Sequence, residues 1–184
     1  VALSFFMGFG LLGHFSNGYD ERHFNSISLR EIDTVMKPNY GLSKQCDGFQ
    51  QLDTCTYGAE PNTVLWGDSY AMHLAPALMG DPESISFVQR TFSSCRPMLG
   101  LSIMGGDYSA EWSQNCLEFN QKTVDWILAN DQIKRVVISS MFLFSGYKLF
   151  DGDRFYAYSF ELVENALVDS LRLLEDAKKE VIIV

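Results

Sequence analysis

One short stretch, residues 63–78, holds the residue types that nucleophilic catalysis needs. Its first four residues predict a buried strand, Gly67-Asp68-Ser69 follows, and apolar residues then recur at helical spacing. A strand that turns directly into a helix places the turn at the carboxyl edge of a sheet and at the N–H-rich end of the helix. A serine there exposes its hydroxyl as a nucleophile, and nearby backbone N–H groups hold a developing oxyanion. The alternative is that Asp68 or Ser69 only caps the helix.

A nucleophilic serine needs a base, and the histidines of this chain are poorly placed to be one. The three histidines are His14, His23 and His73, and all lie at or before position 73. His73 follows Ser69 by one helical turn, where packing or a polar contact is the commoner role, and the other two are expected on the surface. We therefore expect the catalytic base beyond residue 184, and we expect Asp68 to support the turn.

Apolar patterning predicts strands that alternate with helices. The predicted strands are residues 62–67, 84–91, 134–144 and 180–184, the predicted helices are residues 70–79, 109–130 and 158–179, and the expected loops are residues 92–106 and 146–155. Such alternation predicts an α/β fold, a three-layer α/β/α sandwich with a parallel sheet. Function collects at the carboxyl ends of the strands in such sheets, where Ser69, Ser93-Ser94 and Ser139-Ser140 arrive.

The first residues of the chain carry no charge. Residues 1–12 are shorter than the roughly 20 residues that span a bilayer, and they lack the marks of a signal peptide. We expect residues 1–13 to be the end of a transmembrane helix, with a buried N-terminal helix as the alternative. Residues 14–58 are expected to be a linker with a short helix over residues 29–36 and a cysteine loop, and residues 59–184 the α/β domain. Because the chain stops inside an apolar strand, we expect a fragment cut at both ends.

The composition is that of a globular, acidic protein. The chain has 184 residues, 47% of them apolar, which is enough for one domain with a hydrophobic core. Its formal net charge of −9 argues against a nucleic-acid-binding surface. It has no glycine-rich phosphate motif and no histidines or cysteines at metal-ligand spacing, so we expect no cofactor and no metal.

The four cysteines fall into two local pairs. Cys46 and Cys55 bracket a short polar loop, and Cys95 and Cys116 bracket a segment rich in Gly and Ser. Neither pair is a CxxC motif, so two disulfides, Cys46–Cys55 and Cys95–Cys116, fit better than a metal site and indicate an oxidising compartment. The alternative is four reduced, buried thiols in a cytosolic protein.

Four features, taken in order, resemble one family. Residues 66–78 (WGDSYAMHLAPAL) look like the first signature block of SGNH-type (GDSL-like) hydrolases and acyltransferases. More narrowly, the chain is similar to the SGNH domain fused to the C-terminal side of membrane acyltransferase-3 proteins, which acylate bacterial surface polysaccharides. The features that carry this narrower resemblance are QRTFSSCRPMLG (residues 89–100), WSQNCLEFNQKTVDWI (residues 112–127) and VVISSMF (residues 136–142). The resemblance covers about residues 40–184.

The resemblance implies that Ser69 is the nucleophile and that its backbone N–H forms part of the oxyanion hole. The family's aspartate and histidine come from a later D-x-x-H block, which is absent here. Many relatives carry histidine directly after the serine, where this chain has Tyr70. The oxyanion glycine and asparagine blocks of the broader superfamily are also missing, and the backbone N–H of Ser94 or Cys95 is expected in place of the glycine. Asn120 is expected to pack or to lie on the surface.

The function implied is acyl transfer at the periplasmic face of the bacterial inner membrane. A transmembrane acyltransferase domain would deliver an acyl group, with acetyl expected, to Ser69, and a surface-polysaccharide hydroxyl would accept it. One alternative is an SGNH-type esterase or deacetylase, in which water is the acceptor. Another is a non-catalytic glycan-binding module of the acyltransferase, and a third is a cytosolic binding domain. Trp66, Trp112 and Tyr70 are candidates for a sugar platform, although buried aromatic residues are commoner.

Overall fold

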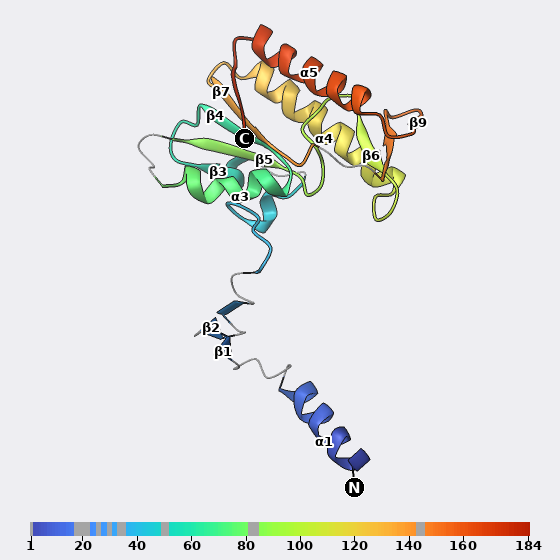
Figure 1. Ribbon diagram of the computed structural model, residues 1–184. Coiled ribbons are helices and arrows are strands. Elements are labelled where there is room, and N and C mark those ends of the chain that lie inside the picture. The colour runs from blue at the N-terminus through green and yellow to red at the C-terminus, as the bar shows by residue number, and fades with distance from the viewer. Residues whose placement is uncertain are drawn as a thin grey trace. The chain divides into compact units, whose positions relative to one another are not determined.

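Two compact units, Val1–Pro38 and Asn39–Val184, make up the chain in this computed structural model (Figure 1). The structure describes residues 2–16, 23–24, 27–28, 31–32, 36–48, 52–80, 85–142 and 146–184.

The first unit contains an apolar helix, α1 (Ala2–Phe15), which is 14 residues long. Large apolar side chains on α1, Phe6 and Leu12 among them, are exposed. Across the described residues, no helix has the length and apolar character that crossing a membrane requires. That residues 1–13 end a transmembrane helix stays a prediction.

A short antiparallel pair follows α1 in the chain. β1 (His23–Phe24) pairs with β2 (Ile27–Ser28). Of the helix predicted over residues 29–36, only Glu31 and Ile32 are described as helical, and residues 29–30 and 33–35 lie outside the described residues.

A parallel sheet forms the centre of the second unit. Its parallel strands are β4 (Thr63–Gly67), β5 (Phe87–Thr91), β7 (Arg135–Ser139) and β10 (Glu180–Ile183). The order across the sheet is β10-β7-β4-β5-β3, in which the edge strand β3 (Thr56–Tyr57) runs antiparallel to β5 and was not predicted. The parallel sheet itself confirms the predicted α/β fold.

Helices cover both faces of this sheet (Figure 1). α3 (Ser69–Leu78) packs on one face, and α4 (Ala110–Ala129) and α5 (Phe160–Asp176) pack on the other. The bounds of all three helices lie within three residues of those predicted. The result is the predicted three-layer sandwich.

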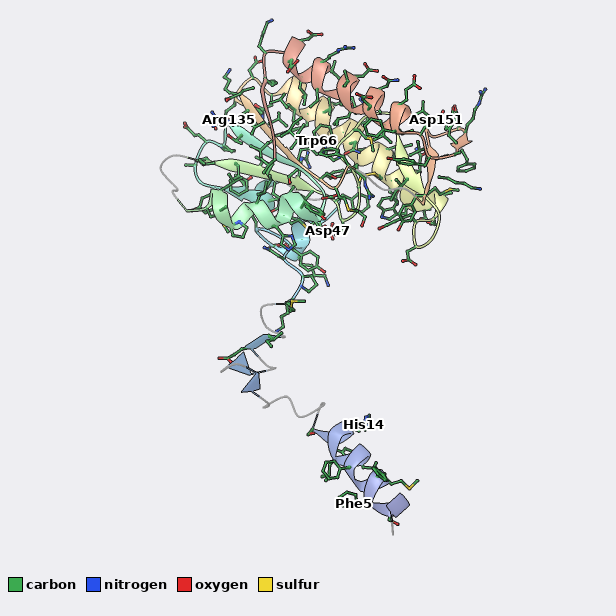
Figure 2. All side chains as sticks on the ribbon, viewed as in Figure 1. Phe5, His14, Asp47, Trp66, Arg135 and Asp151 are labelled. Carbon is green, nitrogen blue, oxygen red and sulfur yellow. A yellow bond between two sulfur atoms is a disulfide. The ribbon has the colours of Figure 1, made fainter. Side chains whose placement is uncertain are left out.

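Successive side chains of the central strands face opposite helix layers. Leu65 of β4 packs with Ala71 and Ala75 of α3. The next residue, Trp66, is fully buried and packs with Phe119 of α4, between the sheet and that helix (Figure 2). Because helices cover both faces, every position of β4 is buried, which explains its continuous apolar run.

A second, antiparallel sheet lies in stretches where loops were expected. β6 (Ser102–Met104), β8 (Lys148–Phe150) and β9 (Phe155–Tyr156) form it in the order β6-β8-β9. The prediction that residues 92–106 and 146–155 are loops is therefore wrong at these strands. The strands are too short for an alternating pattern to stand out, and a separate core that includes Ile103 and Leu149 stabilises them.

The chain before β4 packs against the sheet. Gln89 of β5 is fully buried; its amide oxygen accepts from the N–H of Leu42 at 2.8 Å, and its amide nitrogen donates to the carbonyl of Tyr40 at 2.8 Å. The hydroxyl of Thr91 donates to the carbonyl of Cys46, also at 2.8 Å. These bonds make this part of the chain a member of the compact unit.

The structure joins the cysteines in the two pairs expected from the sequence. The Cys46–Cys55 disulfide closes the loop that precedes β3, and the Cys95–Cys116 disulfide ties the loop after β5 to α4. In both pairs the Cα atoms are 5.5 Å apart, and all four cysteines are buried.

Replacing Cys95 and Cys116 together with alanine should lower the free energy of unfolding by about 3 kcal/mol. The two residues lie 21 positions apart, and the cross-link reduces the chain entropy of the unfolded state. Urea denaturation measures the loss. The matched control is the Cys46→Ala, Cys55→Ala variant, which opens a loop of 9 positions and should lose about 0.7 kcal/mol less. A larger loss in the control would contradict this account.

Candidate active site

The turn between β4 and α3 brings Asp68 and Ser69 to the carboxyl edge of the sheet. Asp68 is the N-cap of α3, and its Oδ1 accepts from the N–H of Tyr70 at 2.9 Å. The Asp68 side chain is buried, in keeping with the expected support of the turn. Ser69 is the first residue of α3 and is half-buried, so its hydroxyl lies at the positive end of a helix.

Gly67 is required by a close approach between two strands. A Cβ atom at position 67 would collide with the carbonyl oxygen of Ser139 on β7, and it would lie 2.9 Å from the Cβ of Ala71. Glycine therefore lets β4 run to the end of β7 and turn at once into α3.

Ser69 lies where the strand order reverses. The first connection leads from β4 to β5 through α3, whereas β7, on the other side of β4, is reached through α4 on the opposite face. Ligands of open α/β sheets bind in the crevice at such a point. Across it, Ser140 donates from its Oγ to Oδ2 of Asp68 at 2.6 Å. Ser140 lies outside the sheet. β7 therefore ends at Ser139, earlier than the strand predicted over residues 134–144.

Ser69, Tyr70 and His73 line a cavity of about 350 Å³. Tyr70 is 53% exposed, and its hydroxyl donates to the sulfur of Met141 at 3.8 Å. The Nδ1 atom of His73 lies 2.6 Å from the backbone carbonyl oxygen of Ser69. The ring is thus bonded to the backbone of its own helix, which is the kind of polar contact expected for it.

The loop after β5 holds the two oxyanion donors expected from the sequence. The N–H of Cys95 donates to the carbonyl of Phe92 at 2.9 Å, so it is already engaged, which corrects the expectation for Cys95. Ser94 has a φ of 63°, in the left-handed region that favours glycine, and its hydroxyl accepts from that of Tyr108 at 2.9 Å. Ser94 therefore takes the backbone conformation typical of a glycine.

The first cysteine loop also reaches this edge. Asp47 accepts from the N–H and from the hydroxyl of Ser93, both at 2.7 Å. The N–H of Phe92 donates to the carbonyl of Gly67 at 3.0 Å. The start of the loop that carries Ser94 is therefore fixed from two sides.

Arg96, which the sequence analysis did not single out, joins the loops that follow β5 and β7. Its Nη1 donates to the carbonyl of Ser94 at 2.6 Å, and its Nε donates to the carbonyl of Met141 at 3.2 Å. The side chain is 4% exposed. Burial lowers the pKa of Arg96, and the charge of Asp68 partly opposes this shift. The available signal was that Arg96 is the single charged residue within residues 92–106.

Asn120 of α4 holds the same loop in place through side-chain hydrogen bonds. It is fully buried; its Oδ1 accepts from Nε1 of Trp66 at 3.0 Å, and its Nδ2 donates to the carbonyls of Arg96 at 2.6 Å and Met98 at 3.0 Å. Both polar atoms of its amide make hydrogen bonds inside the protein, so Asn120 is a structural residue, as expected.

The variant Asn120→Leu should lower the free energy of unfolding by about 3 kcal/mol. It leaves the indole N–H of Trp66 and two loop carbonyls buried without their partner. Urea denaturation measures the loss. The matched control is Gln121→Leu, at the exposed neighbouring position on α4, which should change stability by less than about 0.5 kcal/mol. Equal losses in the two variants would contradict the role of Asn120.

Two further hollows lie away from Ser69. One, lined by Glu60, Asn62, Asp131, Gln132 and Lys134, lies at the amino ends of β4 and β7, and the other lies between α4 and the loop at Asp151. Among the described residues, no three His, Cys, Asp or Glu side chains gather closely enough to hold a metal ion.

The comparison with protein families agrees with this geometry. The family model described as "SGNH domain (fused to AT3 domains)" matches residues 42–184, which include the whole parallel sheet from β4 to β10, its helices and the turn at Ser69. No curated protein and no solved structure matches the chain. Because the match covers most of the chain, this protein belongs to the family of SGNH domains that are fused to AT3 domains.

Proposed function

We propose that this domain transfers an acyl group, with acetyl the expected one, to hydroxyls of a cell-surface polysaccharide through an acyl-enzyme on Ser69. The observation that carries the proposal is the position of Ser69, half-buried at the start of α3 and lining a cavity at the strand-order reversal. Membership of a family of SGNH domains fused to AT3 domains supports acyl chemistry in a membrane-protein context.

In the first step, Oγ of Ser69 attacks the carbonyl carbon of the donated acyl group, and a base takes the hydroxyl proton. The acyl–oxygen or acyl–sulfur bond of the donor breaks, and the donor leaves with a proton. In the second step, a sugar hydroxyl attacks the Ser69 ester, gives up its proton to the same base, and leaves as the O-acylated sugar. Serine is then restored, so the cycle consumes one donor and one hydroxyl.

The negative charge of each tetrahedral intermediate needs N–H donors. The start of α3 supplies a favourable field at Ser69. The backbone N–H of Ser69 is the proposed first donor. The N–H of Ser94 is the proposed second donor, because this residue adopts a glycine-like conformation on the neighbouring loop. Asp68 holds the turn through Tyr70 and Ser140 and takes no proton in the cycle.

The base is proposed to be a histidine, oriented by an aspartate, in a segment beyond residue 184. The end of β10 supports this placement. The N–H of Val184 donates to the carbonyl of Ile138, so β10 ends at the same edge of the sheet as Ser69. Residues that followed Val184 would start beside β7, one strand away from β4.

The acyl donor is proposed to reach Ser69 from a transmembrane AT3 domain, with the SGNH domain in the periplasm. The two disulfides support an oxidising compartment. A membrane-bound donor and an acceptor outside the cell favour transfer over release to water.

Hydrolysis is the second candidate function, since the same serine and the same donors serve an esterase. The observation that favours it is the accessibility of the site: Tyr70, next to Ser69, is 53% exposed. A non-catalytic glycan-binding module is the third candidate, and the absence of the superfamily's oxyanion glycine and asparagine blocks favours it.

The test of the proposed function is acyl transfer in cells that produce the full-length protein. Wild type and Ser69→Ala are compared for O-acetyl content of the surface polysaccharide, with membrane levels of both matched. Loss of O-acetyl groups in Ser69→Ala supports transfer. Unchanged O-acetylation in that variant would reject Ser69 as the acyl carrier, and loss of acetate from an already acetylated glycan in wild type would identify an esterase.

A further inference from the structure

Arg96 is buried in the loop after β5, at the same edge of the sheet as Ser69. Its guanidinium donates to two backbone carbonyls, one on each loop that flanks the nucleophile turn: Ser94 after β5 and Met141 after β7. Asp68, whose charge acts on Arg96, is itself bonded to Ser140 next to Met141. The guanidinium therefore connects the two loops that flank the strand-order reversal, within the electrostatic range of Asp68.

Packing alone does not explain a guanidinium at this position. Burying a charge is costly unless its hydrogen-bonding capacity is used, and an apolar side chain of similar size fills such a space at lower cost. A planar fork with several fixed N–H donors, however, holds two carbonyl oxygens at a set separation, which an apolar residue or an ammonium does not.

The carbonyl that Arg96 holds most closely belongs to the residue with the unusual backbone. Ser94 has a φ of 63° and is not glycine, so its conformation costs free energy and needs outside contacts to persist. Arg96 bonds its carbonyl at 2.6 Å and Tyr108 bonds its hydroxyl at 2.9 Å. The bond from Arg96 fixes the plane of the Ser94–Cys95 peptide, and the bond from Tyr108 holds the Ser94 side chain, so the Cα atom between them is restrained in its left-handed conformation.

We propose that Arg96 is a positioning residue for acyl transfer: it locks the Ser94 loop to the Met141 loop and so holds the Ser94 N–H in place as an oxyanion donor for Ser69. This inference rests on the proposed function. It assigns to Arg96 an effect on the rate of acylation, beyond any effect on stability.

The test is a stopped-flow burst assay on the full-length protein with p-nitrophenyl acetate as the acyl donor. The burst amplitude reports the fraction of enzyme that is folded and acylated, and the saturating burst rate reports the acylation step. Arg96→Met should keep the amplitude and the half-saturating ester concentration near those of wild type and lower the burst rate about 100-fold, the typical effect of losing one oxyanion donor. Arg96→Lys, which keeps the charge without the fork, should lower the rate about 10-fold.

The matched control is Arg90→Met. Arg90 is also largely buried, but it lies within β5 and packs over Trp126, away from the two loops. This variant should burst at the wild-type rate, whatever stability it loses.

Three outcomes separate the claims. A reduced amplitude with a wild-type rate in Arg96→Met would show a role in stability only and overturn the inference. If Arg96→Met does not fold, Arg96→Lys decides, and a wild-type rate there overturns the inference equally. No burst in wild type itself would instead reject the proposed function, and with it the inference.

Discussion

Replacing Ser69 with alanine is expected to remove the burst of p-nitrophenolate from p-nitrophenyl acetate and to lower the turnover of the full-length protein by at least about 10⁴-fold. The reason is that no acyl-enzyme forms without Oγ, and the remaining N–H donors only stabilise a slow attack by water. The substitution leaves the fold intact, because α3 is capped by Asp68, not by Ser69. Stopped-flow absorbance measures the burst.

The matched control for this variant is Ser159→Ala. Ser159 also stands at the start of a helix, where its side chain accepts from the N–H of Leu162 as the N-cap of α5. If Ser69 served only the start of its helix, both variants would lose a little stability and both would keep the burst. A burst retained in Ser69→Ala would reject Ser69 as the nucleophile, and equal background release from wild type and Ser69→Ala would favour the glycan-binding alternative.

Gly67→Ala is expected to have the largest effect on stability, a loss of at least about 4 kcal/mol, above the usual range for overpacking. The added Cβ collides with the backbone carbonyl of Ser139, and neither strand is free to move because both lie in the centre of the sheet. Any variant protein that folds must shift the turn, so its burst rate should also fall by about 100-fold. Urea denaturation and the burst assay measure the two effects.

Gly80→Ala is the matched control, because a Cβ atom there meets only the carbonyl of Ala77 at 3.4 Å. Its stability should lie within about 1 kcal/mol of wild type. A Gly67→Ala protein with wild-type stability and burst would show that the approach of β4 to β7 does not fix the turn.

The main elements of the fold follow from patterns that are local in sequence. The apolar runs of β4 and β7 and the amphipathic pattern of α4 are long enough to identify, and each agrees with its packing in the sandwich. β6, β8 and β9 escaped prediction because two or three residues carry no clear period, and their pairing depends on a core assembled from distant segments. The early end of β7 also depends on a distant partner, because the Ser140 hydroxyl, just after the strand, donates a hydrogen bond to Asp68.

The candidate site likewise contains some residues that the sequence identifies and others whose contacts depend on the fold. The position of Ser69 at the start of a helix and the capping by Asp68 are predictable, because a strand–turn–helix signal is contained in a few consecutive residues. The engaged N–H of Cys95 is set by the turn geometry of its loop, which the residue types do not specify. Arg96 is the single charged residue of its loop in the sequence. Its contact with Met141, 45 positions away, depends on the fold and is visible only in the structure.

The most direct measurement of the central claim is the mass of the acylated protein. The full-length enzyme is mixed with p-nitrophenyl acetate, quenched in acid within the burst phase, and digested for peptide mass spectrometry. Our account predicts one added acetyl group on the peptide that contains Ser69, assigned to its hydroxyl by fragmentation, and no such group in Ser69→Ala. Acetyl on any other residue, or an unmodified Ser69 peptide during a clear burst, would contradict it.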